Sequence, residues 1–350
     1  MLEAEYNRLR EFVQHLQRQV AEERPARVTI IPAVTPRERD WPRWSVTVPT
    51  GIALGLLVAV GLALALELLD TSVHTPRDIV RHVAVPVLGT VPDLDDEEVS
   101  IEQVETAVLT APHSMVAEAF RAIRTNLLLT APAERQRSIL ITSPRPEDGK
   151  TSVAVNLAMA LVQAGRRVLL VDANFRRPAL WKIFREGGPG GLSNILTGQA
   201  TLDELRHPTM LGGLDVLLSG PIPPNPAELL GSPEMRRFIE QATDGYDQVI
   251  FDGPPTLLVS DALALGREVD GVVLVVRAHG NNRGVAQRAR DQLHHVHARI
   301  FGAVLNAAQA RRGGYFREQY RAFYDYRPDE EGAGAPPRSL PAGPGGDSKA

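Results

Sequence analysis

Hydrophobic and polar residues follow three different patterns along this chain. Near the start, apolar residues recur in alternating steps of four and three, at Leu2, Tyr6, Leu9, Val13, Leu16 and Val20. This spacing predicts a helix with one packing seam, as in a coiled coil. Residues 44–66 are then apolar or uncharged throughout, and from about residue 138 short apolar runs alternate with amphipathic segments. These three patterns predict, in chain order, a packing helix, a membrane span and an α/β domain.

The segment from Trp44 to Leu66 carries no charged residue and is long enough to cross a bilayer. It lies too far into the chain for a signal peptide and has no small-residue cleavage pattern. A buried helix of a soluble protein is the alternative. Gly51 and Gly55 have the GxxxG spacing that aids pairing of membrane helices.

Six runs rich in Val, Ile and Leu are the predicted strands of the α/β domain. They cover residues 138–143, 167–171, 214–218, 247–252, 271–277 and 299–305. Strands that alternate with helices in this way predict a mainly parallel sheet with helices on both faces. In such a sheet a ligand binds beyond the carboxyl ends of the strands.

The clearest candidate chemistry follows the first of these strands, in the sequence ILITSPRPEDGKTSVAVNLAMAL. Gly149 lets the backbone approach a phosphate, Lys150 can reach the β- and γ-phosphates, and the Thr151 hydroxyl can bind Mg²⁺. The phosphates would lie at the N-terminus of the following helix. Asp172 and Asp252 end two later strands, so both carboxylates are expected at the same sheet edge. This set indicates a site for a magnesium nucleotide.

The phosphate loop departs from the usual pattern at several positions. Pro144 stands where the first glycine is expected, while Pro146 removes an amide donor and Glu147 adds a negative charge. A chance Gly-Lys-Thr is the alternative explanation. The strand before it, the helix after it and the two acidic strand ends favour a true nucleotide site.

Several segments together resemble the BY-kinases, a family of bacterial tyrosine kinases, fused to the end of a polysaccharide co-polymerase. The loop matches the family's variant Walker A pattern, VLLVDANFRRP resembles its Walker A′ and VIFDGPP its Walker B. The likeness continues through GLSNILTG, PPNPAELLGS, SDALALG and GAVLN. It implies a P-loop NTPase domain of ParA/MinD-like fold, preceded by one transmembrane helix, that uses ATP and Mg²⁺ to phosphorylate tyrosine.

Residue roles follow from this resemblance. Lys150, Asp172 and Asp252 are the expected catalytic residues, with Asp172 as the base for the incoming phenol. Thr151, Asp172 and Asp252 are the expected Mg²⁺ residues. The nucleotide-binding set is expected to be Ser143, Pro146, Asp148, Gly149, Lys150, Thr151, Ser152, Asn174 and Arg176.

Arg176 and Arg177 could neutralise developing charge or lie at an oligomer interface, and a salt-bridged surface turn is the alternative. Asn174 stands where the family often has a second Asp, so one negative charge is missing.

A helix upstream of the phosphate loop matches the family's Glu-x-x-Arg-x-x-Arg pattern at Glu118, Arg121 and Arg124. The three-residue spacing places these side chains on one helix face and Phe120, Ile123 and Leu127 on another. In the family this helix mediates subunit contact, so the resemblance implies a ring-like homo-oligomer. The alternative is a solvated face with local ion pairs.

Four of the six tyrosines lie in GGYFREQYRAFYDYRP, after the last predicted strand: Tyr315, Tyr320, Tyr324 and Tyr326. This position suits a phosphoacceptor, and the family phosphorylates a similar cluster in trans. A short amphipathic helix docked on the domain is the alternative. The resemblance also implies co-polymerase or export proteins and a cognate tyrosine phosphatase as partners.

Composition excludes several other kinds of protein. The net charge of −4 argues against nucleic-acid binding, and the absence of cysteine excludes disulfides, a thiol nucleophile and Cys-based metal sites. The nine histidines show no metal-ligand spacing.

These observations predict five parts. They are an extracytoplasmic helix and Pro-containing linker (1–43), a transmembrane helix (44–69), a cytoplasmic juxtamembrane linker (70–113), the kinase domain (114–312) and a flexible tail (313–350). Arg37, Arg39 and Arg43 before the span would place the N-terminus in the cytoplasm. Because ATP is cytoplasmic, we expect the opposite orientation, a single pass through the inner membrane. The family pattern has a first membrane helix and a large extracytoplasmic domain before this segment. A truncated chain, a mis-assigned start and a split system would each explain their absence from this sequence.

Two other functions remain open at this stage. A ParA/MinD-like ATPase switch shares the fold, although its signature lysine would fall at Arg145. A catalytically weak nucleotide-binding scaffold of the export machinery is the second alternative.

Overall fold

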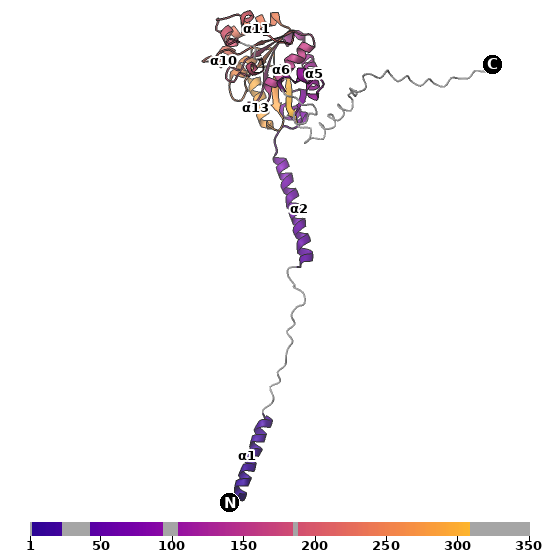
Figure 1. Ribbon diagram of the computed structural model, residues 1–350, viewed down its shortest axis with the longest axis vertical. Coiled ribbons are helices and arrows are strands. Elements are labelled where there is room, and N and C mark those ends of the chain that lie inside the picture. The colour runs from indigo at the N-terminus through magenta and orange to yellow at the C-terminus, as the bar shows by residue number, and fades with distance from the viewer. Residues whose placement is uncertain (1, 23–42, 94–103, 185–187, 309–350) are drawn as a thin grey trace, which may run out of the picture. The chain divides into compact units, whose positions relative to one another are not determined.

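The computed structural model describes residues 2–22, 43–93, 104–184 and 188–308 (Figure 1). The chain divides into two compact units, residues 1–69 and 70–350. Residues 23–42, which include the prolines of the predicted linker within 1–43, and the four tail tyrosines lie outside the described residues.

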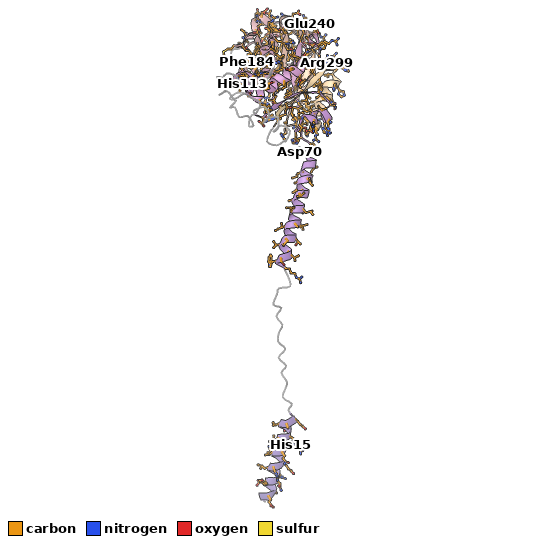
Figure 2. The ribbon with its side chains drawn as sticks, turned by 90° about the vertical axis from the view of Figure 1, so that its right-hand side faces the viewer. His15, Asp70, His113, Phe184, Glu240 and Arg299 are labelled. Atoms are coloured by element: carbon orange, nitrogen blue, oxygen red, sulfur yellow. The ribbon has the colours of Figure 1, made fainter. Side chains whose placement is uncertain are left out.

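The first unit contains two helices, α1 (Leu2–Glu22) and α2 (Trp44–Leu69). Apolar side chains are exposed along both, as Figure 2 shows, including the predicted seam residues Leu9, Val13 and Leu16 on α1. Within α2, residues 44–66 are long and apolar enough to cross a membrane, by length and composition. The helix pattern expected from the sequence is therefore present, with α2 as a candidate membrane helix.

The second unit is built on one eight-stranded sheet in the order β1-β8-β7-β2-β6-β3-β5-β4. All neighbouring pairs are parallel except β4 with β5. The predicted α/β fold with a mainly parallel sheet is confirmed. The strands are β1 Val87–Pro92, β2 Ser138–Thr142, β3 Val168–Asp172, β4 His207–Pro208, β5 Leu214–Leu217, β6 Gln248–Asp252, β7 Gly271–Arg277 and β8 Ile300–Ala308.

Helices cover both faces because the central strands are apolar on both sides. The buried faces of α5 and α6, which lie next to each other in Figure 1, pack with Ile139, Leu170 and Val273. On the opposite face, α11, α12 and α13 pack on a second cluster. The helical elements of this unit are α3 Pro76–Asp78, η1 Ile79–Val83, η3 Val104–Thr106, α4 Ala107–Thr110, α5 Met115–Leu129, η4 Ala133–Arg135, α6 Lys150–Gln163, α7 Leu180–Ile183, α8 Leu192–Leu196, α9 Leu202–Leu205, α10 Pro226–Leu230, α11 Pro233–Gly245, α12 Asp261–Gly266 and α13 Arg283–His295.

Residues 70–92 belong to the folded unit, whereas the sequence led us to place them in a juxtamembrane linker. Strand β1 adds to the sheet edge beside β8, with Val87 opposite Ala303 and Gly89 opposite Val304. Leu88 and Val91 are buried, and Asn126 Nδ2 on α5 donates to the Leu88 carbonyl at 2.7 Å. The second unit therefore begins directly after α2.

Candidate functional site

The phosphate loop joins β2 to α6 and is shaped by one glycine. Gly149 has a left-handed φ of +89°, and a Cβ at this position would collide with the Asn306 side-chain amide. Only glycine meets both conditions without strain. Helix α6 begins at the next residue, Lys150, so its free amide groups open onto the loop. The strand-loop-helix unit expected from the sequence is present.

The Asp148 side chain turns into the loop rather than toward solvent. Its carboxylate accepts hydrogen bonds from Arg145 N at 2.8 Å and Asn281 Nδ2 at 2.7 Å, and it is 3% exposed. Burial raises the pKa of Asp148, and these two donors oppose the rise. These contacts hold the shape of the loop, and a direct role of Asp148 in nucleotide binding stays a prediction.

Two carboxylates lie side by side beneath the loop. Asp172 ends β3, Asp252 ends β6, and the two are register partners in the parallel sheet. Thr151 Oγ1, one residue into α6, donates to Asp252 Oδ2 at 2.7 Å. The sheet and the P-loop helix thus bring together all three residues that the sequence predicted for Mg²⁺.

Complete burial makes both carboxylates unusual acids. Desolvation raises the pKa of Asp252, and the neighbouring Asp172 raises it further, whereas the positive charge of Lys150 lowers it. The pKa of Asp172 is also raised by burial, against three backbone amides that favour its charged form. Those amides belong to Asn174, Ala179 and Leu180, at 3.1, 2.9 and 3.1 Å.

One atom of the pair fits a cation. Asp252 Oδ1 is buried and has no hydrogen-bond partner among the described residues. A buried carboxylate oxygen is costly unless it is hydrogen-bonded or coordinates a metal ion. Oxygen ligands from two carboxylates and a hydroxyl are those that Mg²⁺ prefers. The donor set therefore fits Mg²⁺.

An open pocket of ≈ 270 Å³ lies over the loop. Its wall combines the loop, the start of α6, the turn after β3 and the prolines after β6. Of the predicted nucleotide-binding residues, Ser143, Asp148 and Ser152 do not line it. The lining residues are Pro146, Glu147, Gly149, Lys150, Thr151, Asn174, Arg176, Arg177, Pro178, Ala179, Lys182, Pro254, Pro255, Leu258 and Val259.

Arg176 is held at the pocket rim by an ion pair that the sequence did not reveal. Its Nε and Nη2 donate to the two oxygens of Asp261, at 2.8 and 3.1 Å. Asp261 is buried at the start of α12, whereas the arginine is about half exposed. The salt bridge that the surface-turn alternative expected for Arg176 is therefore present. Arg176 also lines the pocket, beside the position where the phosphates are expected.

The charged face of α5 is paired within the chain. Arg121 Nη1 donates to Glu118 at 2.9 Å and its Nη2 to the Pro112 carbonyl, while Arg124 donates to the Ala160 carbonyl at 3.0 Å. The opposite face is buried as predicted, at Phe120, Ile123 and Leu127. A role of the charged face in subunit contact stays a prediction.

Sequence patterns missed two further residues of the site. Asn281, after β7, and Asn306, on β8, both donate to Asp148, to its side chain and its carbonyl respectively. Asn281 follows β7 and Asn306 lies near the carboxyl end of β8, at the sheet edge where a ligand is expected, which was the available signal. Asn306 is the last residue of the GAVLN segment, but the resemblance gave it no role, and Asn281 lies outside the matched segments.

Comparison with known proteins identifies the family. Residues 137–294 match the model of an AAA domain. The tyrosine-protein kinase YwqD of Bacillus subtilis is 39% identical over 198 residues, which cover 57% of this chain and 84% of YwqD. The chain belongs to the bacterial tyrosine-kinase family.

Two further comparisons show how much of a longer relative, and how much of a solved kinase domain, this chain matches. The tyrosine-protein kinase etk of Escherichia coli is 33% identical over 293 residues, which cover 79% of this chain but only 40% of etk. The solved kinase domain of the Escherichia coli tyrosine kinase ETK is similar with a TM-score of 0.64 and 34% identity, over 69% of this chain and 97% of that domain. The likeness therefore includes essentially the whole of a BY-kinase catalytic domain.

Proposed function

We propose that this chain is an ATP-dependent protein tyrosine kinase that phosphorylates the tyrosine-containing tails of neighbouring copies. The observation that carries the proposal is the buried pair Asp172 and Asp252, with Thr151 bonded to one of them, directly beneath a phosphate loop. Membership of the bacterial tyrosine-kinase family supports the choice of tyrosine as the acceptor.

ATP and Mg²⁺ are the cofactors that fit the pocket. Lys150 and the free amides at the start of α6 would hold the phosphates, and Thr151 and Asp252 would hold the metal ion. Bound Mg²⁺ supplies charge neutralisation for the transferred phosphoryl group. Binding would also give Asp252 Oδ1 the partner that it lacks among the described residues.

Asp172 is the residue that we assign to the acceptor phenol. It would take the phenol proton as the phenol oxygen bonds to the γ-phosphorus of ATP and the bond from that phosphorus to the leaving ADP breaks. Three amides fix its orientation, and burial raises its pKa toward neutrality, which makes it a stronger proton acceptor than an ordinary aspartate. Arg176 and Arg177, at the pocket rim, can neutralise the developing charge.

We also propose a cellular setting, which membership of the family and the apolar helix α2 support. We propose that α2 anchors the chain in the inner membrane with the kinase domain in the cytoplasm, and that Glu118, Arg121 and Arg124 help to form a ring-like homo-oligomer. The acceptors would be Tyr315, Tyr320, Tyr324 and Tyr326, reset by a cognate phosphatase. The process regulated would be polymerisation and export of capsular polysaccharide or exopolysaccharide, together with a co-polymerase or export proteins.

The test is to incubate the full chain, purified in detergent, with Mg-ATP and to map phosphate by mass spectrometry. We expect phosphate on residues 315–326 that is lost in Lys150→Met and in a variant with all four tail tyrosines replaced by Phe. ATP hydrolysis without tyrosine labelling would favour the ATPase switch. Nucleotide binding with neither activity would favour the scaffold.

A further inference from the structure

The loop that follows β7 contacts the phosphate loop through a buried hydrogen bond. Asn281 Nδ2 donates to Asp148 Oδ1 at 2.7 Å, while Asp148 Oδ2 accepts from Arg145 N at 2.8 Å. The Asn281 side chain is fully buried and Asp148 is 3% exposed. Because a buried carboxylate needs donors of this kind, Asn281 fixes where Asp148, and with it the loop, can lie.

The phosphate loop depends on such outside contacts because its own sequence offers few. Pro144 and Pro146 have no amide hydrogen, and Glu147 has a left-handed φ of +64°. Besides Asn281, Arg277 Nη1 donates to the Glu147 carbonyl at 3.2 Å. Residues 277–281 therefore contact two consecutive residues of the loop, immediately before Gly149 and Lys150.

The same loop is paired on its other side with the first residues of the folded unit. Val73 N donates to the Asn281 carbonyl at 2.9 Å and His279 N donates to the Val73 carbonyl at 3.0 Å. A third backbone bond joins Arg283 N to the Thr71 carbonyl at 2.9 Å. The backbone that carries Asn281 is thus paired to the segment that directly follows α2.

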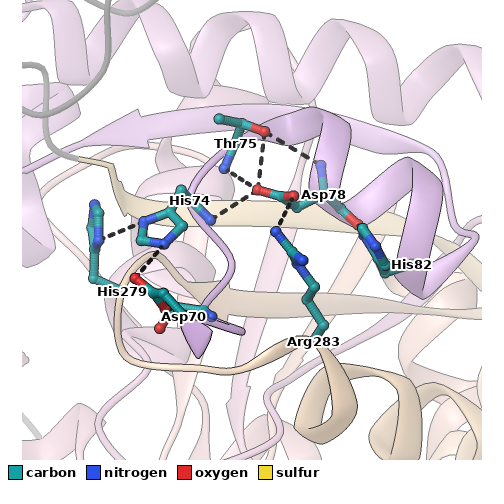
Figure 3. Close-up of polar contacts among 8 residues, drawn as sticks. Asp70, His74, Thr75, Asp78, His82, His279 and Arg283 are labelled. Atoms are coloured by element: carbon teal, nitrogen blue, oxygen red, sulfur yellow. Dashed lines mark hydrogen bonds and ion pairs between the residues drawn. The ribbon is translucent and has the colours of Figure 1, made fainter. Parts of the chain in front are cut away.

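Side chains reinforce this pairing, as Figure 3 shows. His74 Nδ1 and His279 Nδ1 lie 2.8 Å apart, and His74 Nε2 lies 3.1 Å from Asp70 Oδ2. A neutral His74 that donates Nε2–H to Asp70 accepts at Nδ1 from His279. Asp78 accepts from Arg283 Nη2 at 3.1 Å, at the start of α13 directly after this loop. We call residues 70–78 the membrane-proximal segment.

We propose that Asn281 is a positioning residue for nucleotide binding, and that the membrane-proximal segment holds it in place through the His74–His279 contact. The proposal rests on the phosphate-binding part of the proposed function and not on tyrosine transfer. A change at the membrane-proximal segment would then alter nucleotide affinity without contacting the pocket.

The first experiment measures the dissociation constant of a fluorescent ADP analogue, with Mg²⁺, for the full chain in detergent. Asn281→Ala should weaken binding roughly tenfold, the loss expected for one buried hydrogen bond to a charged group. Asn281→Asp should weaken it further, because two carboxylates then face each other. The double variant Asp148→Asn with Asn281→Asp restores one donor to one carboxylate, and should bind more tightly than Asn281→Asp alone.

Asn282→Ala is the matched control. Asn282 lies next in the chain and caps α13 by accepting from Val285 N at 2.9 Å, so its loss should lower thermal stability and leave the dissociation constant unchanged. Equal loss of affinity in Asn281→Ala and Asn282→Ala, or no rescue by the double variant, would overturn the positioning role.

The second experiment tests the contact with the membrane-proximal segment. His279 has φ +58°, which asparagine tolerates, so His279→Asn removes the ring contact with little backbone strain. The control is His297→Asn at an exposed position with φ +60°. His279→Asn should weaken ADP binding several-fold, and less so when Asn281 is already Ala. Unchanged affinity in His279→Asn, or full additivity with Asn281→Ala, would contradict the proposed link.

Discussion

Asp252 combines complete burial with a carboxylate oxygen that has no partner among the described residues. Without a cation its charge is therefore costly, and function and stability oppose each other at this residue. We predict that Asp252→Asn abolishes phosphorylation yet stabilises the nucleotide-free chain at pH 7.5 by roughly 1–3 kcal/mol. Thermal unfolding without Mg²⁺ measures this. A lower melting temperature for Asp252→Asn would contradict our account of the site's electrostatics.

The same carboxylate gives the stability a definite pH dependence. The pKa of Asp252 is raised from an ordinary value of 3.8 to about 7. Between these two pH values the folded chain keeps the Asp252 proton, whereas the unfolded chain has lost it. The contribution of this proton to the free energy of unfolding is therefore present at low pH and is lost as the pH rises from 3.8 to about 7. We expect this fall in the nucleotide-free wild type and a smaller fall in Asp252→Asn.

Thr151 donates a side-chain hydrogen bond to Asp252. Replacing it by Val removes the hydroxyl that donates to Asp252 and would bind Mg²⁺, with little change in volume. We predict a loss of phosphorylation of about 100-fold or more and weaker enhancement of nucleotide binding by Mg²⁺. Thr125→Val, at an exposed position of α5, is the control. If Thr151→Val were phosphorylated as fully as the wild type, the Thr151 hydroxyl would have no part in catalysis.

At the scale of elements, β1 is the strand that adds residues 87–92 to the sheet of the second unit. Gly89 lets it approach α5, because a Cβ there would collide with Ile123. Gly89→Ala should therefore destabilise the chain by about 1–3 kcal/mol, measured by denaturant unfolding. Gly245→Ala is the matched control, because a Cβ there meets nothing within 4 Å. Equal effects of the two changes would mean that β1 is not closely packed.

The sequence predicted the central strands well because they are apolar runs that end in Asp172, Asp252 or a phosphate loop. It did not predict β1, whose six residues include Gly89 and end in Pro92, two residue types that are depleted in strands. Nor could it find Asn281 or Asp261, since their importance comes from side chains that are distant in the chain, Asp148 and Arg176. Periodicity and motifs record local order, whereas these contacts depend on the completed sheet.

At the scale of the whole molecule, the charged face of α5 tests assembly. The Glu118 side chain is about half exposed, and its carboxylate forms an ion pair with Arg121. Glu118→Arg would replace that ion pair by repulsion, at little cost to the monomer because exposed pairs contribute little. We predict dissociation of the oligomer in sedimentation velocity with an unchanged melting temperature. Glu240→Arg, at an exposed position of α11, is the control, and an intact oligomer in Glu118→Arg would place the interface elsewhere.

The central claim is that this site transfers phosphate to the tail of another copy. One mixing experiment tests it most directly, with Lys150→Met as acceptor and, as donor, the chain with its four tail tyrosines replaced by Phe. Neither should be labelled alone with Mg-ATP. Together, we expect phosphate on residues 315–326 of the Lys150→Met chain, found by mass spectrometry. An unlabelled mixture, although the donor binds ATP and the wild-type chain forms oligomers, would contradict a trans-acting tyrosine kinase.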